Sequence, residues 1–404
     1  VLFEATSGDP GRQRRVAETV CLIAAAWPPD LLTGRLLSGL ANLYRGVGML
    51  REAAERSEQA VPLLRAAGAA GRNALLTTDR GMAYDLHVLG QYTQALGRMQ
   101  ELHVRSVELF GDSHRQTLFT ALNRAVIEHL AGRHGSALEV AREALDVQVA
   151  RARPGDRLTT RLTHRVGELL TVTGRADEAV HLLSRRLLVL EGQRDGDTYG
   201  GLLLRHQLAI ARRAAGGPFD GSSPGPPGGP GAADLSKVQR EMAAVLGAGD
   251  PNALAATFSL AIERAGRSTS RALALAGTCH RGFVDHFSDD HPFVGLCQMA
   301  IGAFTLDDGR AAEGLRVCAD AAEGLGDRLG ESHPWSMAAV LHLARAHGAN
   351  GRYRKAGELA ADVAARAAEL LGETHPVHLT ARAAVEAADQ EVPLPVHHVE
   401  VPCT

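Results

Sequence analysis

The strongest constraint on this chain is a glycine followed five residues later by a small residue, a pair that recurs in steps of 42 residues. In the first half the pairs are Gly48/Ala53, Gly90/Ala95, Gly132/Ala137 and Gly174/Ala179, and the same step separates Gly309/Gly314 from Gly351/Ala356 in the second half. A second marker keeps the same step at His291-Pro292, His333-Pro334 and His375-Pro376. A fixed period of this length indicates a chain built by stacking one supersecondary unit.

One period contains two predicted helices. Within residues 112–153, Leu118 and Leu122 share one helical face, and Leu138 and Leu145 share a second face after the glycine. Glycine can close the first helix because it accepts a left-handed backbone. Proline can start the next helix because the first helical position needs no backbone N–H. The predicted unit is therefore a helical hairpin.

Small residues form a second column, twelve positions before the alanine marker. They are Ala41, Ala83, Ala125, Gly167, Ala209, Gly302 and Ala344. Small side chains let two helices approach closely, so this column predicts where the helices of each pair touch. The order of small residue, turn glycine and alanine resembles the tetratricopeptide repeat. The period of 42 residues and the Gly-Glu-Ser-His-Pro and Gly-Glu-Thr-His-Pro turns resemble its kinesin-light-chain type.

This resemblance covers nearly the whole chain and implies its fold class. We expect an all-α, right-handed α-solenoid of about eight helical hairpins with a terminal capping helix. We expect an N-terminal helical cap over 1–27, with a helix near Gln13–Ala26, followed by a repeat array over 28–215. A flexible Gly/Pro-rich loop is expected over 216–233. A second stretch of array follows over 234–389, with a closing helix near Val377–Ala388, and then a disordered tail over 390–404.

The register is interrupted once, at a Gly/Pro-rich segment. Twelve of the sixteen residues in 216–231 are Gly or Pro, a composition that cannot bury a core. The next marker, Ala272, follows Gly221 by 51 residues instead of 42. We interpret the segment as a long loop inside the fifth hairpin, with Asp234–Leu246 as the delayed second helix. The alternative is a linker between two separate solenoids.

Composition and charge give no drive towards nucleic acid or membranes. The net charge is −3 and the pI is near 6.7. The longest apolar run, Val20–Trp27, has eight residues, against about 20 needed to cross a bilayer. The N-terminal residues do not show the charged and then apolar pattern of a signal peptide, so we expect a cytoplasmic protein. Two lysines against 41 arginines favour a GC-rich genome, such as that of an actinobacterium. Val1 fits either a GTG start or the C-terminal part of a longer protein.

No motif predicts an enzyme, a cofactor or a metal site. Neither Lys237 nor Lys355 has the Gly-x-x-x-x-Gly-Lys context of a phosphate-binding loop. The close pairs typical of a zinc site are missing from the set Cys279, His280, His286, His291 and Cys297. His397, His398 and Cys403 lie in the predicted disordered tail, and the alternative is that they capture a metal adventitiously. We expect a non-enzymatic protein without a cofactor.

The resemblance also implies where a ligand would bind. In tetratricopeptide solenoids the first helix of each pair lines a concave groove. Transferring that register predicts a peptide-binding groove of Arg35, Asn42, Arg45, Arg80, Tyr84, His87, Asn123, His129, Arg161, His164, Arg165, Glu168, His206, Gln207 and Arg213. Arginine holds carboxylates in a bidentate manner, so we expect an extended peptide with acidic groups or a free C-terminus. The alternative is that these arginines are simply solvated.

The histidines of this set add a pH expectation. Imidazole gains charge below about pH 6.5, so we expect binding of an acidic peptide to tighten there through His87, His129, His164 and His206. In the C-terminal half, the same positions are mostly apolar: Met299, Ala300, Ala303, Leu306 and Leu341, with His342, Arg345 and His347 among them. The two halves could hold different parts of one partner, or the C-terminal half could stack on another domain.

The leading functional hypothesis is a protein-protein interaction scaffold that binds a protein or peptide in this groove. One alternative is the C-terminal sensory arm of a larger signalling ATPase, since the array is similar to those of actinobacterial NB-ARC regulators of the STAND type. A second alternative is a peptide-sensing regulator, which would need a helix-turn-helix domain that this sequence does not contain.

Overall fold

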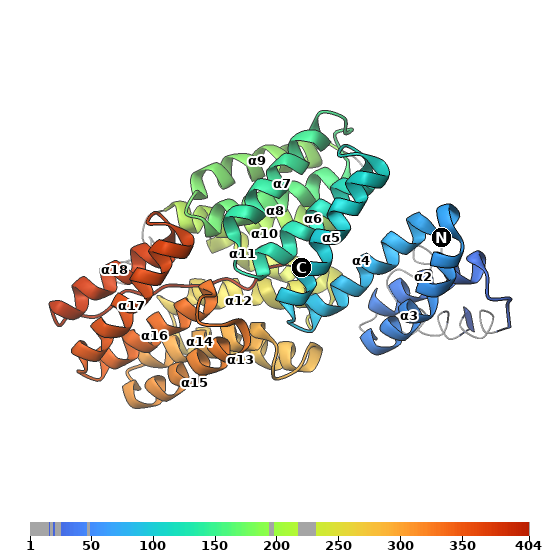
Figure 1. Ribbon diagram of the computed structural model, residues 1–404. Helices are drawn as coiled ribbons and strands as arrows, with labels where there is room; N and C mark the ends of the chain where they lie inside the picture. The colour runs from blue at the N-terminus through green and yellow to red at the C-terminus, as the bar shows by residue number, and fades with distance from the viewer. Residues whose placement is uncertain are drawn as a thin grey trace. The chain divides into compact units, whose positions relative to one another are not determined.

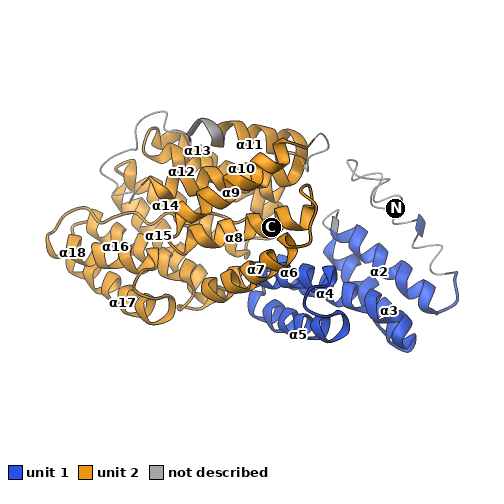
Figure 2. Ribbon diagram, turned by 90° about the horizontal axis from the view of Figure 1, so that it is seen from above, with its two compact units in different colours: residues 1–127 blue, residues 128–404 orange. Residues whose placement is uncertain are grey.

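The protein is described by a computed structural model that places residues 16, 19–20, 26–46, 49–193, 198–216 and 232–403. These residues form α-helices and one short 3₁₀ turn, with no strand among them (Figure 1). The chain divides into two compact units, Val1–Ile127 and Glu128–Thr404 (Figure 2). The expected all-α repeat fold is confirmed.

Unit 1 contains the first repeats. Its helices are α2 (Leu31–Gly46), α3 (Leu50–Ala66), α4 (Arg72–Val88), α5 (Tyr92–Phe110) and α6 (Arg115–Leu130) up to Ile127, with the 3₁₀ turn η1 (Gly68–Gly71) before α4. Helix α2 packs against α3 and α4, and α4 against α5. The small residues Ala41 and Ala83 are fully buried at these contacts.

Unit 2 continues the same order of paired helices. They are α7 (His134–Val149), α8 (Arg157–Val172), α9 (Ala176–Glu191), α10 (Thr198–Ala215), α11 (Ala232–Leu246), α12 (Pro251–Ala265), α13 (Thr269–His286), α14 (Pro292–Asp307), α15 (Ala311–Leu329), α16 (Pro334–Ala349), α17 (Tyr353–Leu371) and α18 (Pro376–Asp389). From α7 onward each helix packs against the next. The first helices of the pairs also touch, as in α8 with α10 and α14 with α16. Over the described residues, α2 to α17 make eight pairs, and α18 follows them.

The sequence markers mark the turns and the tight helix contacts. Gly132 and Gly174, between the helices of their pairs, have φ of +77° and +82°, a conformation that favours glycine. Gly167 lies where α8 touches α9, and a Cβ added there would come within 2.6 Å of a Leu183 methyl carbon. The small-residue column is therefore a packing requirement.

The His-Pro markers start helices. Pro292, Pro334 and Pro376 occupy the first position of α14, α16 and α18. The preceding histidine caps each helix, because its Nδ1 accepts the amide proton two residues later at 3.1–3.2 Å. The sequence predicted the proline's position, but we did not predict the histidine cap.

Two expected segments lie largely outside the described residues: the N-terminal cap over 1–27 and most of the Gly/Pro-rich segment, residues 217–231. The helices on either side of the second segment are placed. Helix α10 packs against α11, which begins at Ala232, and both belong to unit 2. The segment thus connects two helices that pack together.

Residues 391–403, which we call the tail, are placed in the structure. The expectation that residues 390–404 are disordered is wrong for this segment. The tail has neither helix nor strand, yet it lies against the helices of unit 2 (Figure 1). Leu394, Val401 and Cys403 are only 5%, 1% and 4% exposed. The prolines Pro393, Pro395 and Pro402 suit an extended chain, and side chains of unit 2 supply its polar partners.

Candidate functional site

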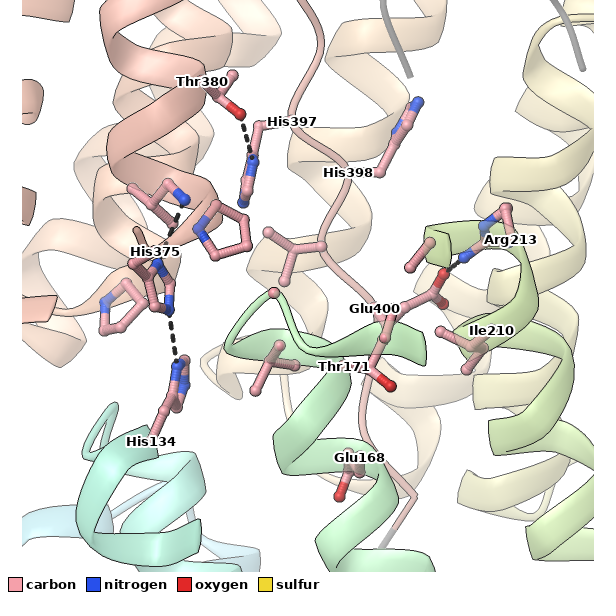
Figure 3. Close-up of a pocket in the computed structure, with 18 of the residues that line it drawn as sticks. His134, Glu168, Thr171, Ile210, Arg213, His375, Thr380, His397, His398 and Glu400 are labelled. Atoms are coloured by element: carbon pink, nitrogen blue, oxygen red, sulfur yellow. Dashed lines mark hydrogen bonds and ion pairs between the residues drawn. The ribbon is translucent and has the colours of Figure 1, made fainter. Parts of the chain in front are cut away.

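The tail crosses unit 2 along the first helices of the pairs. Its polar contacts come from Thr380 on α18, His342 on α16, Ser259 on α12, and then α10 and α8. We call this surface the tail groove: the faces of α8, α10, α12, α16 and α18 that contact the tail. Figure 3 shows the extended chain between the α18 side, where His397 meets Thr380, and α10, where Glu400 meets Arg213.

Two groove side chains bind the main chain of the tail. His342 Nε2 donates to the carbonyl oxygen of His397 at 2.8 Å, and Arg165 Nη2 donates to that of Cys403 at 3.0 Å. Burial lowers the pKa of His342 to about 4, so the imidazole is neutral and donates its single N–H. Such contacts bind a polypeptide independently of its side chains.

One carboxylate of the tail is bound specifically. Glu400 forms an ion pair with Arg213, and the Ser259 hydroxyl donates to Glu400 Oε2 at 2.6 Å. The two charged side chains are only 18% and 17% exposed. Burial lowers the pKa of Arg213 to about 10, which still leaves the guanidinium charged at neutral pH. Charge-assisted hydrogen bonds of this kind are stronger than neutral ones.

His206 connects the end of the tail to the same carboxylate. Its Nε2 lies 3.0 Å from Ser259 Oγ and its Nδ1 lies 3.2 Å from Cys403 Sγ. Since the Ser259 proton goes to Glu400, the serine oxygen can accept from His206 Nε2–H, and Nδ1 then accepts the thiol proton. The relay therefore runs from Cys403 through two groove residues to Glu400.

This relay is not built for nucleophilic catalysis. Burial raises the pKa of the Cys403 thiol above its usual range and lowers that of His206 to about 3. A reactive cysteine needs a lowered pKa, because the thiolate is the nucleophile. The thiol therefore stays protonated and acts as a hydrogen-bond donor.

The floor of the groove on α8 holds a buried ion pair. Arg165 pairs with Glu168, both about 95% buried, and His129 Nε2 lies 3.9 Å from Glu168 Oε1. Burial raises the pKa of Glu168 to about 7, and the nearby Arg165 opposes that shift. Arg165 thus joins the groove floor to the Cys403 carbonyl.

A cavity of about 810 Å³ remains beside the tail. The tail forms one wall, and Thr171 on α8 and Ile210 on α10 line another (Figure 3). Trp335 and Leu379 contribute apolar surface from α16 and α18. The groove therefore has space next to its bound segment.

Turns from the two ends of unit 2 meet beside this cavity. His333 Nε2 donates to the Leu130 carbonyl at 2.9 Å, and His134 Nδ1 lies 3.4 Å from His375 Nε2 (Figure 3). The turn glycine Gly132 lies so close to the start of α16 that an added Cβ would come within 2.5 Å of Pro334. The caps of α16 and α18 thus also hold the early repeats of unit 2.

Seven predicted groove residues lie in unit 2 on the first helices that form or flank the tail groove. They are His129, His164, Arg165, Glu168, His206, Gln207 and Arg213. Arg161, also on α8, is exposed. The predicted pH response is wrong for three histidines of this set, because burial lowers the pKa of His129, His164 and His206 below 6.5. These imidazoles stay neutral in mild acid.

The predicted residues of unit 1 have other surroundings. Arg45 makes a bidentate ion pair with Asp85 at 2.6 and 2.7 Å and joins α2 to α4. Arg80 donates to Gln116 and stacks over the Phe119 ring, 4.7 Å from its centroid. The expectation that Arg45 is an open ligand contact is wrong, because the next repeat supplies its carboxylate.

The other predicted residues of unit 1 differ in exposure. Arg35 is exposed and donates to the Ala70 carbonyl at 2.9 Å. Asn42 and Tyr84 are exposed, Asn123 is half-buried and His87 is buried. They share the first-helix positions assigned from the register.

Sequence reasoning missed the residues that complete the groove. Ser259 and Thr380 were not predicted, and His342 was noted only as a polar position on an apolar face. Glu400 was missed because a short proline-containing segment at the end of a repeat array carries no periodic signal. An acidic residue among apolar ones in that segment was the available hint.

The described part of the chain lacks two kinds of feature. No group of three or more His, Cys, Asp or Glu side chains there is arranged to hold a metal ion. No helix there has both the length and the apolar character required to cross a membrane.

Comparisons with known proteins agree with the repeat architecture. The tetratricopeptide repeat family matches residues 74–148, and no curated protein matches the sequence. Among solved structures, a Rap protein complexed with competence and sporulation factor is 10% identical, covering 89% of this chain and 86% of that one, with a TM-score of 0.57.

Two further structures are less similar in shape. The kinesin light chain TPR-like repeats of Podosopora anserina are 23% identical and cover 52% of this chain and 96% of that one, with a TM-score of 0.38. A STAND protein with a tetratricopeptide repeat sensor from Pyrococcus horikoshii is 10% identical, covering 85% of this chain and 51% of that one, with a TM-score of 0.47. The family match shows tetratricopeptide repeats in residues 74–148, and paired helices of the same all-α repeat fold continue through the rest of the described chain.

Proposed function

We propose that this chain is a non-enzymatic interaction scaffold that binds an extended segment of a partner protein or peptide in the tail groove. The observation that carries the proposal is the tail itself, an extended polypeptide bound through its main chain and one carboxylate. Because the groove accommodates this extended segment of the chain itself, it is wide enough for an extended segment of another protein and offers the same hydrogen-bonding side chains.

The groove contacts define what a ligand must supply. His342 and Arg165 require main-chain carbonyls, which any extended peptide has. Arg213 and Ser259 favour an acidic side chain between those two points. This agrees with the hypothesis of an acidic peptide ligand.

Similarity to the Rap protein supports the binding of another molecule by this fold. That structure was solved in complex with competence and sporulation factor, and its fold resembles the present one over most of both chains. For the present chain, the groove chemistry favours an extended peptide with an acidic side chain.

A display library of linear peptides, selected against the intact chain, tests this function. Selections would use the wild type and Glu400→Arg, a variant that removes the tail's ion pair and places a second positive charge next to Arg213. We expect selected peptides to carry Asp or Glu at one position and to lose binding to Arg213→Glu. The matched control is Arg382→Glu, at a largely exposed arginine on α18 that does not line the cavity.

Equal binding to Arg213→Glu and Arg382→Glu would place the binding surface elsewhere and contradict the proposal. A failure to select any peptide on both the wild type and Glu400→Arg would also contradict it.

A further inference from the structure

We propose that the tail is the resting ligand of the tail groove, and that an external peptide of similar chemistry binds by displacing it. This inference rests on the proposed function and adds the regulation of the same site. The partner it predicts is an extended peptide with a carboxylate at the position of Glu400 and a carbonyl three residues later for Arg165.

The attachment of the tail to the rest of the chain allows release. The amide of Val392 donates to the Ala387 carbonyl of α18 at 2.9 Å, and this is the last such bond between the tail and that helix. Beyond it, no backbone–backbone hydrogen bond holds residues 393–403 in the part of the chain that is placed. The tail is held by groove side chains and apolar burial, so it can leave without opening a helix or a sheet.

The contacts of the tail are of the kind that a separate peptide can reproduce. His342 and Arg165 bind carbonyls, and Arg213 with Ser259 binds a carboxylate. None of these contacts requires a covalent connection to α18. The cavity of about 810 Å³ beside the tail also gives an incoming segment space before the tail has fully left.

Covalent attachment nevertheless favours the tail. A segment joined by a short linker has an effective concentration on the order of 1 mM at its site. An external peptide with the same contacts must compete with that concentration and will bind the wild type weakly. Weakening the tail alone should therefore strengthen external binding, whereas weakening the groove should abolish it.

The probe is a synthetic peptide of residues 392–403 with a dye at its N-terminus, an amidated C-terminus and a reducing agent present. Glu400 is its only carboxylate. Fluorescence anisotropy would measure its binding to four intact chains: the wild type, Glu400→Arg, Arg213→Glu and the double variant Arg213→Glu/Glu400→Arg.

We expect Glu400→Arg to bind the peptide at least about tenfold more tightly than the wild type, because its own tail competes less well. A peptide with Glu400→Gln should bind that chain at least about tenfold less tightly. Arg213→Glu should not bind the original peptide. In the double variant, the arginine at position 400 can pair with the glutamate at position 213, so the tail again occupies the groove. A peptide that carries Glu400→Arg should therefore bind the double variant more weakly than it binds Arg213→Glu, whose own tail does not compete.

Equal affinity of the wild type and Glu400→Arg would overturn the inference, since the tail would not block the groove. Absence of binding to Glu400→Arg, or equal binding of the original peptide and its Glu400→Gln version, would overturn it as well. If library peptides bind in an Arg213-dependent manner but with equal affinity to the wild type and Glu400→Arg, only this inference fails and the proposed function stands.

Discussion

Arg213 on α10 and Glu400 in the tail form a largely buried ion pair that connects the middle of the chain to its C-terminal segment. Breaking a buried pair from one side is costly, because the remaining charge keeps its desolvation penalty. The pair therefore both anchors the tail and selects for a carboxylate. The hydroxyl of Ser259 also donates to the Glu400 carboxylate, so the preference for a carboxylate depends on this neutral group as well as on Arg213.

Replacing Ser259 with alanine should lower the free energy of unfolding by about 1–3 kcal/mol. The change removes the donor to Glu400 and leaves His206 Nε2 without the partner that it has at 3.0 Å. Urea denaturation followed by circular dichroism measures the effect. Ser270→Ala, at an exposed serine on α13, is the control and should change stability little. Equal stability of both variants would show that the relay contributes nothing.

Removing the guanidinium of Arg165 should destabilise unit 2 by about 1–3 kcal/mol, because buried hydrogen-bond acceptors lose their donor while the Glu168 carboxyl, whose pKa burial raises to about 7, can take up a proton. Its partner Glu168 would remain buried without a cation, and the Cys403 carbonyl would lose a donor. Arg161→Ala is the matched control, because that arginine lies on the same helix but is exposed. Urea titrations of both variants decide the matter. A loss in Arg165→Ala no greater than in Arg161→Ala would contradict the buried-pair interpretation.

The fold could be predicted from the sequence because its determinants act locally in every period. Gly132 and Gly174 set turns, Gly167 allows a close helix contact, and each of them recurs with the same spacing. The faces of the first helices follow from the same register. The register therefore places His206 and Arg213 on one face of α10, and both contact the tail there.

The occupant of the groove could not be predicted in this way. Contacts such as His206 with Cys403 depend on the path of the chain after α18, where no period exists. The register also cannot say whether a neighbouring repeat supplies a counterion. Arg45 was assigned to the ligand for that reason, although Asp85 on the next first helix already binds it.

Acid should weaken both the fold of unit 2 and the docking of the tail, the reverse of the response expected from sequence. The pKa of His206 falls from 6.5 to about 3, through burial first and the charge of Arg213 second. Between those values the unfolded chain binds a proton that the folded chain does not, so stability is lost as pH falls below 6.5.

His206→Gln checks that pH dependence. Glutamine does not titrate, so between about pH 4 and 6 the slope of unfolding free energy against pH should decrease by about 1.4 kcal/mol per pH unit. Urea denaturation at several pH values gives both slopes. His181→Gln, on α9 outside the cavity lining, serves as the control. Identical slopes for the wild type and His206→Gln would mean that this imidazole is not held neutral.

Two glycines with the same backbone but different surroundings test the contact between early and late repeats of unit 2. Gly132 has φ of +77° and an added Cβ would meet Pro334 Cδ at 2.5 Å, whereas Gly351 has φ of +73° and open space around it. Gly351→Ala should lose only the backbone preference, about 1–2 kcal/mol. Gly132→Ala should lose about 1–3 kcal/mol more, because the turn must move away from the start of α16. If urea denaturation gave equal losses, the turn and α16 would not be in contact in solution. A larger loss at Gly132 would establish the contact between this turn and the start of α16, where Pro334 lines the cavity.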